Sequence, residues 1–266
     1  MPFTFAHPAI VLPLRGVRRF SFLALVFGSM APDFEYFLRL QPYSSVSHTW
    51  AGLFLFDLPM TFLLAVLFHG IVKRAVIAHL PAPFDRGLLH WAEAPWALTS
   101  LRSFLVFCYS AVLGSVTHIV WDSFTHDGAF MVSRLPLLQQ NAELAGLAIP
   151  VYKFFQHGST LIGLLCIGIV IAKETRHGLH ANHLERKAGS KPVKAQDRSR
   201  SCREKWFFWL CVAGFGVFAA GTYLFSIGGL FPHFRPLRAV VPFLSGCMLG
   251  LIVVSWLSRL GRPPRR

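Results

Sequence analysis

Charged residues are scarce in this chain, and acidic residues are the scarcest. Asp, Glu, Lys and Arg together make up 14% of its 266 residues, whereas a soluble domain averages about one quarter. Apolar residues supply 54% of the chain. This balance is atypical of a soluble globular domain and indicates an integral membrane protein.

Several sequence signatures of enzymes are also missing. The chain contains no Gly-x-Ser-x-Gly motif, which argues against an α/β-type serine hydrolase, and no Gly-rich phosphate-binding loop. Its five cysteines form no Cys-x-x-Cys pair, and most of them lie within apolar runs, where a free cysteine behaves as a small apolar residue. We therefore expect neither a disulfide framework nor a thiolate metal site.

Long apolar runs are what the chain does have. Several approach or exceed the ~20 residues that an α-helix needs to cross a bilayer, and they occupy residues 51–72, 102–122, 151–172, 206–230 and 237–258. A further apolar stretch, residues 20–38, is interrupted by Pro32, Asp33 and Glu35. The sequence therefore predicts an all-α, polytopic helical membrane protein with five full spans plus an N-terminal re-entrant or half-spanning helical hairpin.

The formal net charge of +14 could indicate a nucleic-acid-binding protein, but the positive charge is concentrated between the apolar runs. Residues 173–205 alone contain ten Lys and Arg residues. The positive-inside rule places such segments on the cytoplasmic side. We therefore expect no nucleic acid partner, a multi-pass protein of the cell membrane, and a cytoplasmic C-terminus.

These runs and the basic segment divide the chain into three predicted parts. Residues 1–172 form a membrane domain, residues 173–205 a basic and flexible cytoplasmic linker, and residues 206–266 a C-terminal transmembrane hairpin with a basic tail. Gly214, Gly216 and Gly221 would permit close helix packing in the hairpin. We expect this hairpin to act as scaffold or to join copies of the chain in a homo-oligomer.

The second apolar run ends in a regular series of polar side chains. His118, Asp122 and His126 are four residues apart, and each such step turns only about 40° around a helix axis, so all three lie on one stripe. Two imidazoles and a carboxylate are a suitable ligand set for zinc or a similar divalent ion. Ionisable residues at membrane depth are costly and indicate a functional site.

The topology brings further histidines to the same level. His48 precedes the first span, and His157 lies at the start of the third. The topology rests on Lys and Arg alone, yet it places both histidines at the membrane face that carries Asp122 and His126. This agreement favours one shared site.

The N-terminal segment adds His7 and Asp33 under one condition. Both reach the outer face if residues 8–31 fold as a helical hairpin that dips into the bilayer, with the arginines near residues 15–19 at its tip. Non-helical backbone at that depth must be covered by protein or water. We favour this hairpin over a complete sixth span.

Each of these residues also has a purely structural interpretation. Asp33, after Pro32, could cap a turn, and His48, beside Trp50, could lie at the membrane interface. His157 could be a satisfied interior histidine, and Asp122 could orient a histidine without any metal. The metal hypothesis depends on all of them lying at one level.

The ordered motifs resemble a known family. The resemblance covers most of the chain, and the bacterial membrane family catalogued as domain of unknown function 4184 carries similar motifs at residues 1–9, 28–34, 47–49, 117–126 and 156–160. The resemblance implies no established activity.

The layout is similar, more weakly, to inner-membrane proteins described as metal-dependent hydrolases. These share an N-terminal His, a Pro-Asp turn, a His-Ser or His-Thr step and a late His-x-x-x-Asp pair, matched here by His7, Asp33, His48, His118 and Asp122. Two features depart from that pattern. The His-Arg-Gly element before the Thr-His-Ser step is absent, and Glu35 replaces the second carboxylate of the Pro-Asp-x-Asp turn.

A metal-dependent hydrolase is the first function that we infer. The predicted ligands are His48, His118, Asp122 and His126, completed by His7, Asp33 and His157, and they would hold one or two divalent ions, most simply zinc, with manganese or iron as alternatives. Such an ion supplies hydroxide near neutral pH, and Glu35 or Asp127 is the expected general base. At the outer membrane–water boundary the site would meet membrane lipids, so phosphoester or ester hydrolysis is expected.

Two other functions fit the same residues. Intramembrane His and Asp residues build proton or metal-ion pathways in transporters, although no inverted repeat is visible. A structural membrane protein could use the His/Asp cluster only to lock its helices together.

Overall fold

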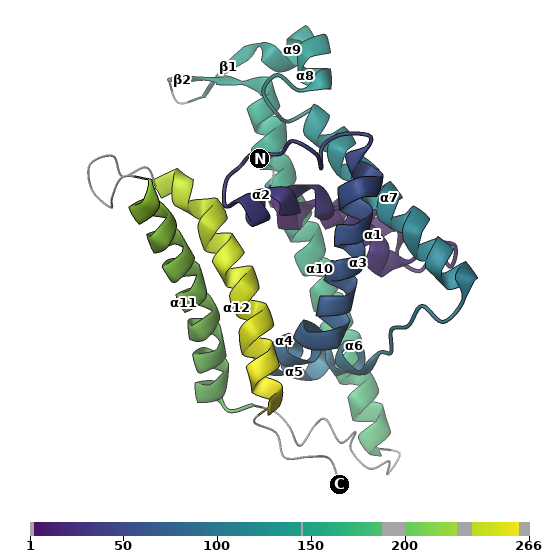
Figure 1. The fold of residues 1–266 in the computed structure, drawn as a ribbon. Coiled ribbons are helices and arrows are strands. Elements are labelled where there is room, and N and C mark those ends of the chain that lie inside the picture. Colours follow the sequence, from purple (N-terminus) through teal and green to yellow (C-terminus); the bar gives the residue numbers. More distant parts are fainter. Residues whose placement is uncertain (1–2, 145, 188–199, 228–235, 261–266) are drawn as a thin grey trace. The chain divides into compact units, whose positions relative to one another are not determined.

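The computed structural model describes residues 3–144, 146–187, 200–227 and 236–260. The described chain is almost entirely helical, and its only sheet has two strands. Five helical segments are long and apolar enough to cross a membrane: Leu53–His79, Leu101–Ser123, Val151–Leu184, Cys202–Ser226 and Val240–Leu260. The predicted all-α class with five spans is confirmed, and these features are those of a multi-pass membrane protein (Figure 1).

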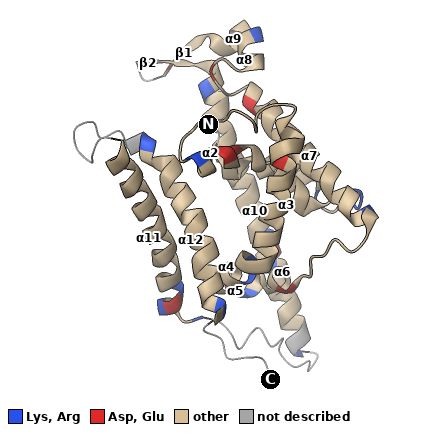
Figure 2. Ribbon diagram, viewed as in Figure 1, with Lys and Arg blue, Asp and Glu red and all other residues tan. Residues whose placement is uncertain are grey.

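The long helices carry few charges along their length. Figure 2 shows mostly uncharged ribbon along α7 (Leu101–Ser123), α11 (Cys202–Ser226) and α12 (Val240–Leu260). Ser100 caps the start of α7: its side chain accepts a hydrogen bond from the N–H of Ser103, and the Ser103 side chain accepts one from the N–H of Ser100. This capping box satisfies N–H groups that have no partner inside the helix.

The first span is not one regular α-helix. It consists of η3 (Leu53–Asp57), α3 (Leu58–Leu67), η4 (Phe68–Val72) and α4 (Lys73–His79), of which η3 and η4 are π-helical. Short π-helical turns are rare and often accompany functional positions. Here one of them places the carboxylate of Asp57 in the interior.

The N-terminal segment folds as the predicted helical hairpin. The 3-10 helix η1 (Thr4–Leu14) is followed by α1 (Phe22–Gly28), the single turn η2 (Ala31–Asp33) and α2 (Phe34–Arg39). The N–H of Ser21 donates to Ser110 Oγ at 3.0 Å, and the Tyr109 hydroxyl donates to the carbonyl of Arg19. The turn of the hairpin therefore lies against the middle of α7.

Two glycines set the contact between α1 and α7. A Cβ added at Gly28 would collide with the carbonyl of Ala111, and one added at Gly114 would collide with the carbonyl of Leu25. The two backbones approach so closely that only glycine fits at these positions, as at small-residue crossings of membrane helices. This close crossing brings Ser29 and Asp33, just beyond α1, next to the last turns of α7.

The segment between the second and third spans folds into short helices and a strand pair. It forms α8 (Phe130–Arg134), α9 (Pro136–Gln139) and the antiparallel strands β1 (Asn141–Leu144) and β2 (Leu147–Pro150), with Asn141 paired to Pro150. A hairpin of two four-residue strands has too weak an alternating pattern to be seen in the sequence.

The chain divides into two compact units. The first comprises Met1–Glu35, Ser44–Ala65 and Leu98–Val170, and the second comprises Tyr36–Tyr43, Val66–Ala97 and Ile171–Arg266. The boundaries differ from the predicted domain division at residues 172 and 205, because each unit gathers segments that are distant in sequence. Every residue of the candidate site described below belongs to the first unit.

The second unit is held by paired polar groups as well as apolar contacts. The Lys205 ammonium pairs with Asp85 of α5 (Phe84–Gly87). The Trp209 indole donates to the His79 carbonyl at 2.9 Å. Lys73 Nζ donates to the carbonyl of Ala94, just after α6 (Leu89–Glu93).

The predicted flexible linker is wrong over its first part. α10 runs from Val151 to Lys187, so residues 173–187 continue the third span as helix. Charged residues such as Lys and Glu are good helix formers, and they do not end a helix where the apolar run ends. The remainder of the predicted linker, residues 188–199, lies outside the described residues.

The C-terminal hairpin packs on a different set of glycines from the predicted one. A Cβ at Gly216 of α11 would meet Cys247 and Phe243, whereas Gly214 and Gly221 have no neighbouring atom within 4 Å. α12 contributes Gly246 and Gly250, which lie close to α11. Contact between copies of the chain through this hairpin stays a prediction.

Candidate metal centre

The site begins at the end of α7. His118 and Asp122 lie one turn apart, and both are buried. His118 Nε2 is 3.3 Å from Asp122 Oδ2. The predicted stripe on one helix face therefore does bring an imidazole nitrogen and a carboxylate oxygen together.

Asp33 joins this pair from the N-terminal hairpin. Its Oδ1 atom is 3.5 Å from His118 Nε2, and its Oδ2 atom accepts a 2.6 Å hydrogen bond from the Thr4 hydroxyl. Burial alone would raise the pKa of Asp33, but the facing His118 ring outweighs burial and holds that pKa below its usual value. Thr4 was not among the predicted site residues, although it precedes His7 by only three positions.

His48 approaches from the loop before the first span. Its Nε2 atom is 3.8 Å from Asp33 Oδ1 and 3.7 Å from Asp122 Oδ2. One ligand atom from each of Asp33, His48, His118 and Asp122 lies within 4.8 Å of the other three. We call these four residues the His/Asp group.

Glu35 shapes the loop that carries His48. Its carboxylate accepts hydrogen bonds from the N–H groups of Ser45, Val46 and Ser47, at 3.0, 3.1 and 2.8 Å, and from the Ser45 hydroxyl at 3.1 Å. With both oxygens engaged, the carboxylate holds the backbone immediately before His48. The geometry therefore favours a positioning role for Glu35, and its role as general base stays a prediction.

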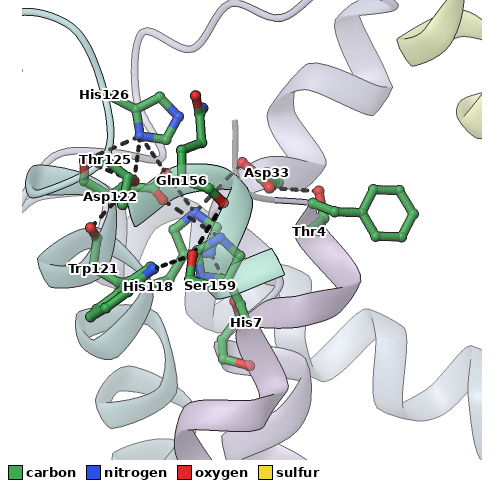
Figure 3. Close-up of polar contacts among 12 residues, drawn as sticks. Thr4, His7, Asp33, His118, Trp121, Asp122, Thr125, His126, Gln156 and Ser159 are labelled. Carbon is green, nitrogen blue, oxygen red and sulfur yellow. Dashed lines mark hydrogen bonds and ion pairs between the residues drawn. The ribbon is translucent and has the colours of Figure 1, made fainter. Parts of the chain in front are cut away.

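His7 stacks on the edge of the group. Its ring lies 3.8 Å from the His118 ring, centroid to centroid, with 18° between the planes. His7 Nε2 is 3.5 Å from Asp122 Oδ1, so the two carboxylate oxygens of Asp122 face two different imidazoles (Figure 3). Burial lowers the pKa of His7 to about 3, which favours the neutral ring that a metal ligand requires.

The hydrogen bonds of His118 leave an unusual contact. His118 Nδ1 lies 2.8 Å from the carbonyl oxygen of Ser29, which can only accept, so Nδ1 carries the hydrogen. In a neutral ring, Nε2 is then an acceptor, yet it faces Asp33 Oδ1 and Asp122 Oδ2, which are also acceptors. His118 Nε2, Asp33 Oδ1, Asp122 Oδ1 and His7 Nε2 are buried without a hydrogen-bond partner among the described residues. Such an arrangement requires a cation, either a metal ion or a proton on the ring.

Three predicted site residues do not join the His/Asp group. His126 turns its Nδ1 to the Asp122 carbonyl at 3.1 Å, and lies 3.6 Å from Asp122 Oδ2, beside the group. His157 and Asp127 have exposed side chains. The buried residue at the start of α10 is Gln156, the neighbour of His157. A sequence pattern cannot decide which of two adjacent helix residues faces inward when the helix is apolar on all sides.

Asp57 is the residue that the sequence analysis missed. Its carboxylate is fully buried, and neither oxygen has a hydrogen-bond partner among the described residues. It interacts electrostatically with His118, Glu35 and Asp33. Thr61, one turn later, is also fully buried with an unpartnered hydroxyl. A lone Asp inside the first apolar run was the available signal, because a buried carboxylate is expensive.

Comparison with known proteins identifies the family. A family described as "Domain of unknown function (DUF4184)" matches residues 1–256. The chain belongs to this family. No curated protein and no solved structure matches the chain.

Membership in the DUF4184 family covers the whole candidate site. The matched residues include the N-terminal hairpin, the loop of His48 and the end of α7. The resemblance predicted from the ordered motifs is thus confirmed, while the weaker similarity to inner-membrane metal-dependent hydrolases stays a prediction.

Proposed function

We propose that the His/Asp group binds a divalent metal ion, and that the protein is a metal-dependent hydrolase acting at the membrane–water boundary. Asp33, His48, His118 and Asp122 are the proposed ligands, with His7 stacked beside them. The observation that carries the proposal is the contact of His118 Nε2 with two carboxylate oxygens while its Nδ1 donates to the Ser29 carbonyl, which leaves a position between the three atoms for a cation.

The spacing of the ligand atoms supports a metal. In a tetrahedral site with bonds of about 2.0 Å, ligand atoms lie roughly 3.3 Å apart. The imidazole–carboxylate separations in the group, from 3.3 to 3.8 Å, are close to that value. Two imidazoles with two carboxylates suit zinc best, and manganese or iron next.

The residues around the group would support hydrolysis. A bound divalent ion lowers the pKa of a coordinated water and so supplies hydroxide. Ser29 fixes the tautomer of His118, Thr4 orients Asp33, and Glu35 holds the loop of His48. Such outer contacts keep ligands in place around catalytic metals.

The position of the group suggests the substrate. His118 and Asp122 lie in the last turns of a membrane-spanning helix, so the bond to be cleaved would lie near lipid head groups. We propose phosphoester or ester bonds of membrane lipids. From the distribution of Lys and Arg we further propose that the protein lies in the cell membrane with a cytoplasmic C-terminus.

The first experiment measures metal content in detergent-purified protein. His177, His180 and His183, which are exposed on α10, are replaced beforehand to remove adventitious binding. The proposal expects near-stoichiometric metal in this background and its loss in His118→Ala and His48→Ala. His157→Ala, at an exposed histidine outside the group, is the matched control and should keep the metal.

The same preparations separate the proposal from its alternatives. Well-folded protein without metal after reloading would contradict the proposal and leave His118 as an imidazolium that locks helices together. Metal-loaded protein is then tested for release of phosphate or fatty acid from phosphatidylglycerol vesicles, and absence of both would remove the assignment of this lipid class.

Asp57 and Thr61 favour one second candidate function. They place oxygens that have no hydrogen-bond partner among the described residues in the first turns of the first span, and polar groups inside a span can form part of an ion pathway. In that case proteoliposomes should show metal-dependent proton or metal-ion flux that Asp57→Asn abolishes.

A further inference from the structure

An apolar groove adjoins the His/Asp group within the first unit. It has a volume of about 300 Å³ and is formed by η1, α7 and α10. Its lining residues are Ala6, His7, Ala9, Ile10, Trp121, Ser159, Ile162, Gly163 and Cys166. This volume is at the small end of the range for ligand sites, which suits a narrow occupant.

The groove is polar at one end and apolar along the rest. Ser159 accepts a 3.2 Å hydrogen bond from the Trp121 indole, and Figure 3 shows these two side chains near His7. Farther along α10 the lining consists of Ile162, Gly163 and Cys166. The seven helical steps from Ser159 to Cys166 extend roughly 10 Å along the helix.

The two helices η1 and α10, which form two walls of the groove, run in the same direction from N-terminus to C-terminus. The N–H of Phe3 donates to Thr160 Oγ1 at 3.1 Å, and a Cβ on Gly163 would meet Ala6. His7 of η1 and Ser159 of α10 both line the groove and contribute polar side chains to it. His7 also faces Asp122 in the His/Asp group, so the polar end of the groove opens toward the candidate metal centre.

The surroundings indicate what fills the groove. α7 and α10 are both long and apolar enough to span a membrane, so the groove is open to a bilayer, where hydrocarbon chains are the abundant apolar molecules. A hydrocarbon chain that carries a polar group at one end matches a groove that is polar at one end.

We propose that this groove holds one acyl chain of a membrane lipid, with the polar part of that lipid at His7 and the His/Asp group. The inference rests on the proposed hydrolase function for the role of that lipid as substrate. It assigns the substrate class: an amphiphile with a linear apolar chain, held so that its ester or phosphoester reaches the metal.

The test uses a photoactivatable lipid. Full-length protein in phosphatidylcholine nanodiscs receives phosphatidylglycerol with a diazirine in the middle of one acyl chain, and mass spectrometry maps the adducts after illumination. The proposal expects adducts to concentrate on groove residues, about tenfold over exposed Leu161 and Leu165 of the same helix. Even labelling along the exposed face of α10 would mean ordinary boundary lipid and would overturn the proposal.

A matched pair of variants adds a second readout. Ile162 lines the groove and is 64% exposed, whereas Leu161 is 71% exposed and does not line it, so both tolerate a larger side chain. Ile162→Trp should fill the groove and lower groove labelling about tenfold, while Leu161→Trp should leave it unchanged. Equal labelling in the two variants would contradict the proposal.

One further variant separates this inference from the proposed function. His118→Ala, which should lose the metal, is labelled in parallel. If the wild-type protein binds no metal and its groove is still labelled, the lipid site is supported and the hydrolase proposal fails. A metal-loaded, active protein with even labelling overturns the lipid site alone.

Discussion

The two units of this protein differ in how their buried charged groups are paired. In the second unit, Lys205 pairs with Asp85, and the Trp209 indole donates to the His79 carbonyl. In the first unit, carboxylates and imidazoles face one another with several atoms lacking any hydrogen-bond partner among the described residues. A satisfied pair stabilises a helix contact, whereas facing acceptors cost free energy until a cation arrives. The difference separates polar residues that pair within the fold from those of the proposed metal site.

Removing the metal should have the largest effect on this comparison. If the His/Asp group binds zinc, protein with metal at about 1,000 times its Kd gains about 4 kcal/mol over metal-free protein. A chelator should therefore lower the Tm markedly, and added zinc should restore it. His48→Ala should show the low Tm with and without zinc, and an equal zinc response in this variant would place the metal elsewhere.

Breaking the ion pair of the second unit should have the next largest effect on stability. Asp85→Ala leaves the buried ammonium of Lys205 without its carboxylate, which should cost about 3 kcal/mol of stability. Metal content should be unchanged, because Asp85 belongs to the other unit. The double variant Asp85→Leu with Lys205→Met should recover most of the loss in a thermal unfolding assay. Loss of metal in Asp85→Ala would contradict the separation of roles.

Loosening the loop of His48 should have a smaller effect. Glu35→Gln keeps the shape of the side chain but weakens its hydrogen bonds to the three N–H groups of Ser45, Val46 and Ser47. Loss of such outer support typically lowers metal affinity about 10- to 100-fold. A competition titration with a fluorescent zinc chelator measures the change, and Glu143→Gln, at an exposed strand residue, is the control. If Glu35 were instead a general base, turnover would fall with affinity unchanged.

Replacing Asp57 should have the smallest effect on stability, and any change should be a gain in stability instead of a loss. Asp57→Asn removes a carboxylate whose oxygens have no partner among the described residues, so the Tm should stay within a few degrees or rise. Thr61→Val is the companion variant and should behave alike. A large loss of stability in Asp57→Asn would show that the carboxylate has a cationic partner.

Much of this fold follows from apolar runs alone. Each of the five predicted spans matches a helix in the structure, because about 20 apolar residues in a row have no other stable arrangement in a bilayer. The N-terminal hairpin also follows from Pro32 and Asp33, which interrupt an apolar stretch. What hydropathy could not supply was the extension of α10 beyond residue 172, since charged residues continue a helix as readily as they end a span.

The candidate site was predictable where spacing on one helix decides it. His118 and Asp122 lie one turn apart, so any helix brings them together. His157 shows the limit, because its exposure depends on the rotation of α10, which packing against η1 sets. Asp57 and Thr4 were missed because a single Asp or Thr in an apolar segment has no spacing pattern, and its role appears only when other elements surround it.

The hydrogen bond between the Phe3 N–H and Thr160, 157 residues apart, bears on how the protein is made. His7 leaves the ribosome long before α10 exists, and the wall that holds η1 in place is synthesised only after both later ligands, His118 and Asp122. The contacts of the N-terminal hairpin with α10 therefore form only after the third span has been made. Under the proposed function, acquisition of metal would report that the first three spans are in place, before α11 and α12 complete the five spans.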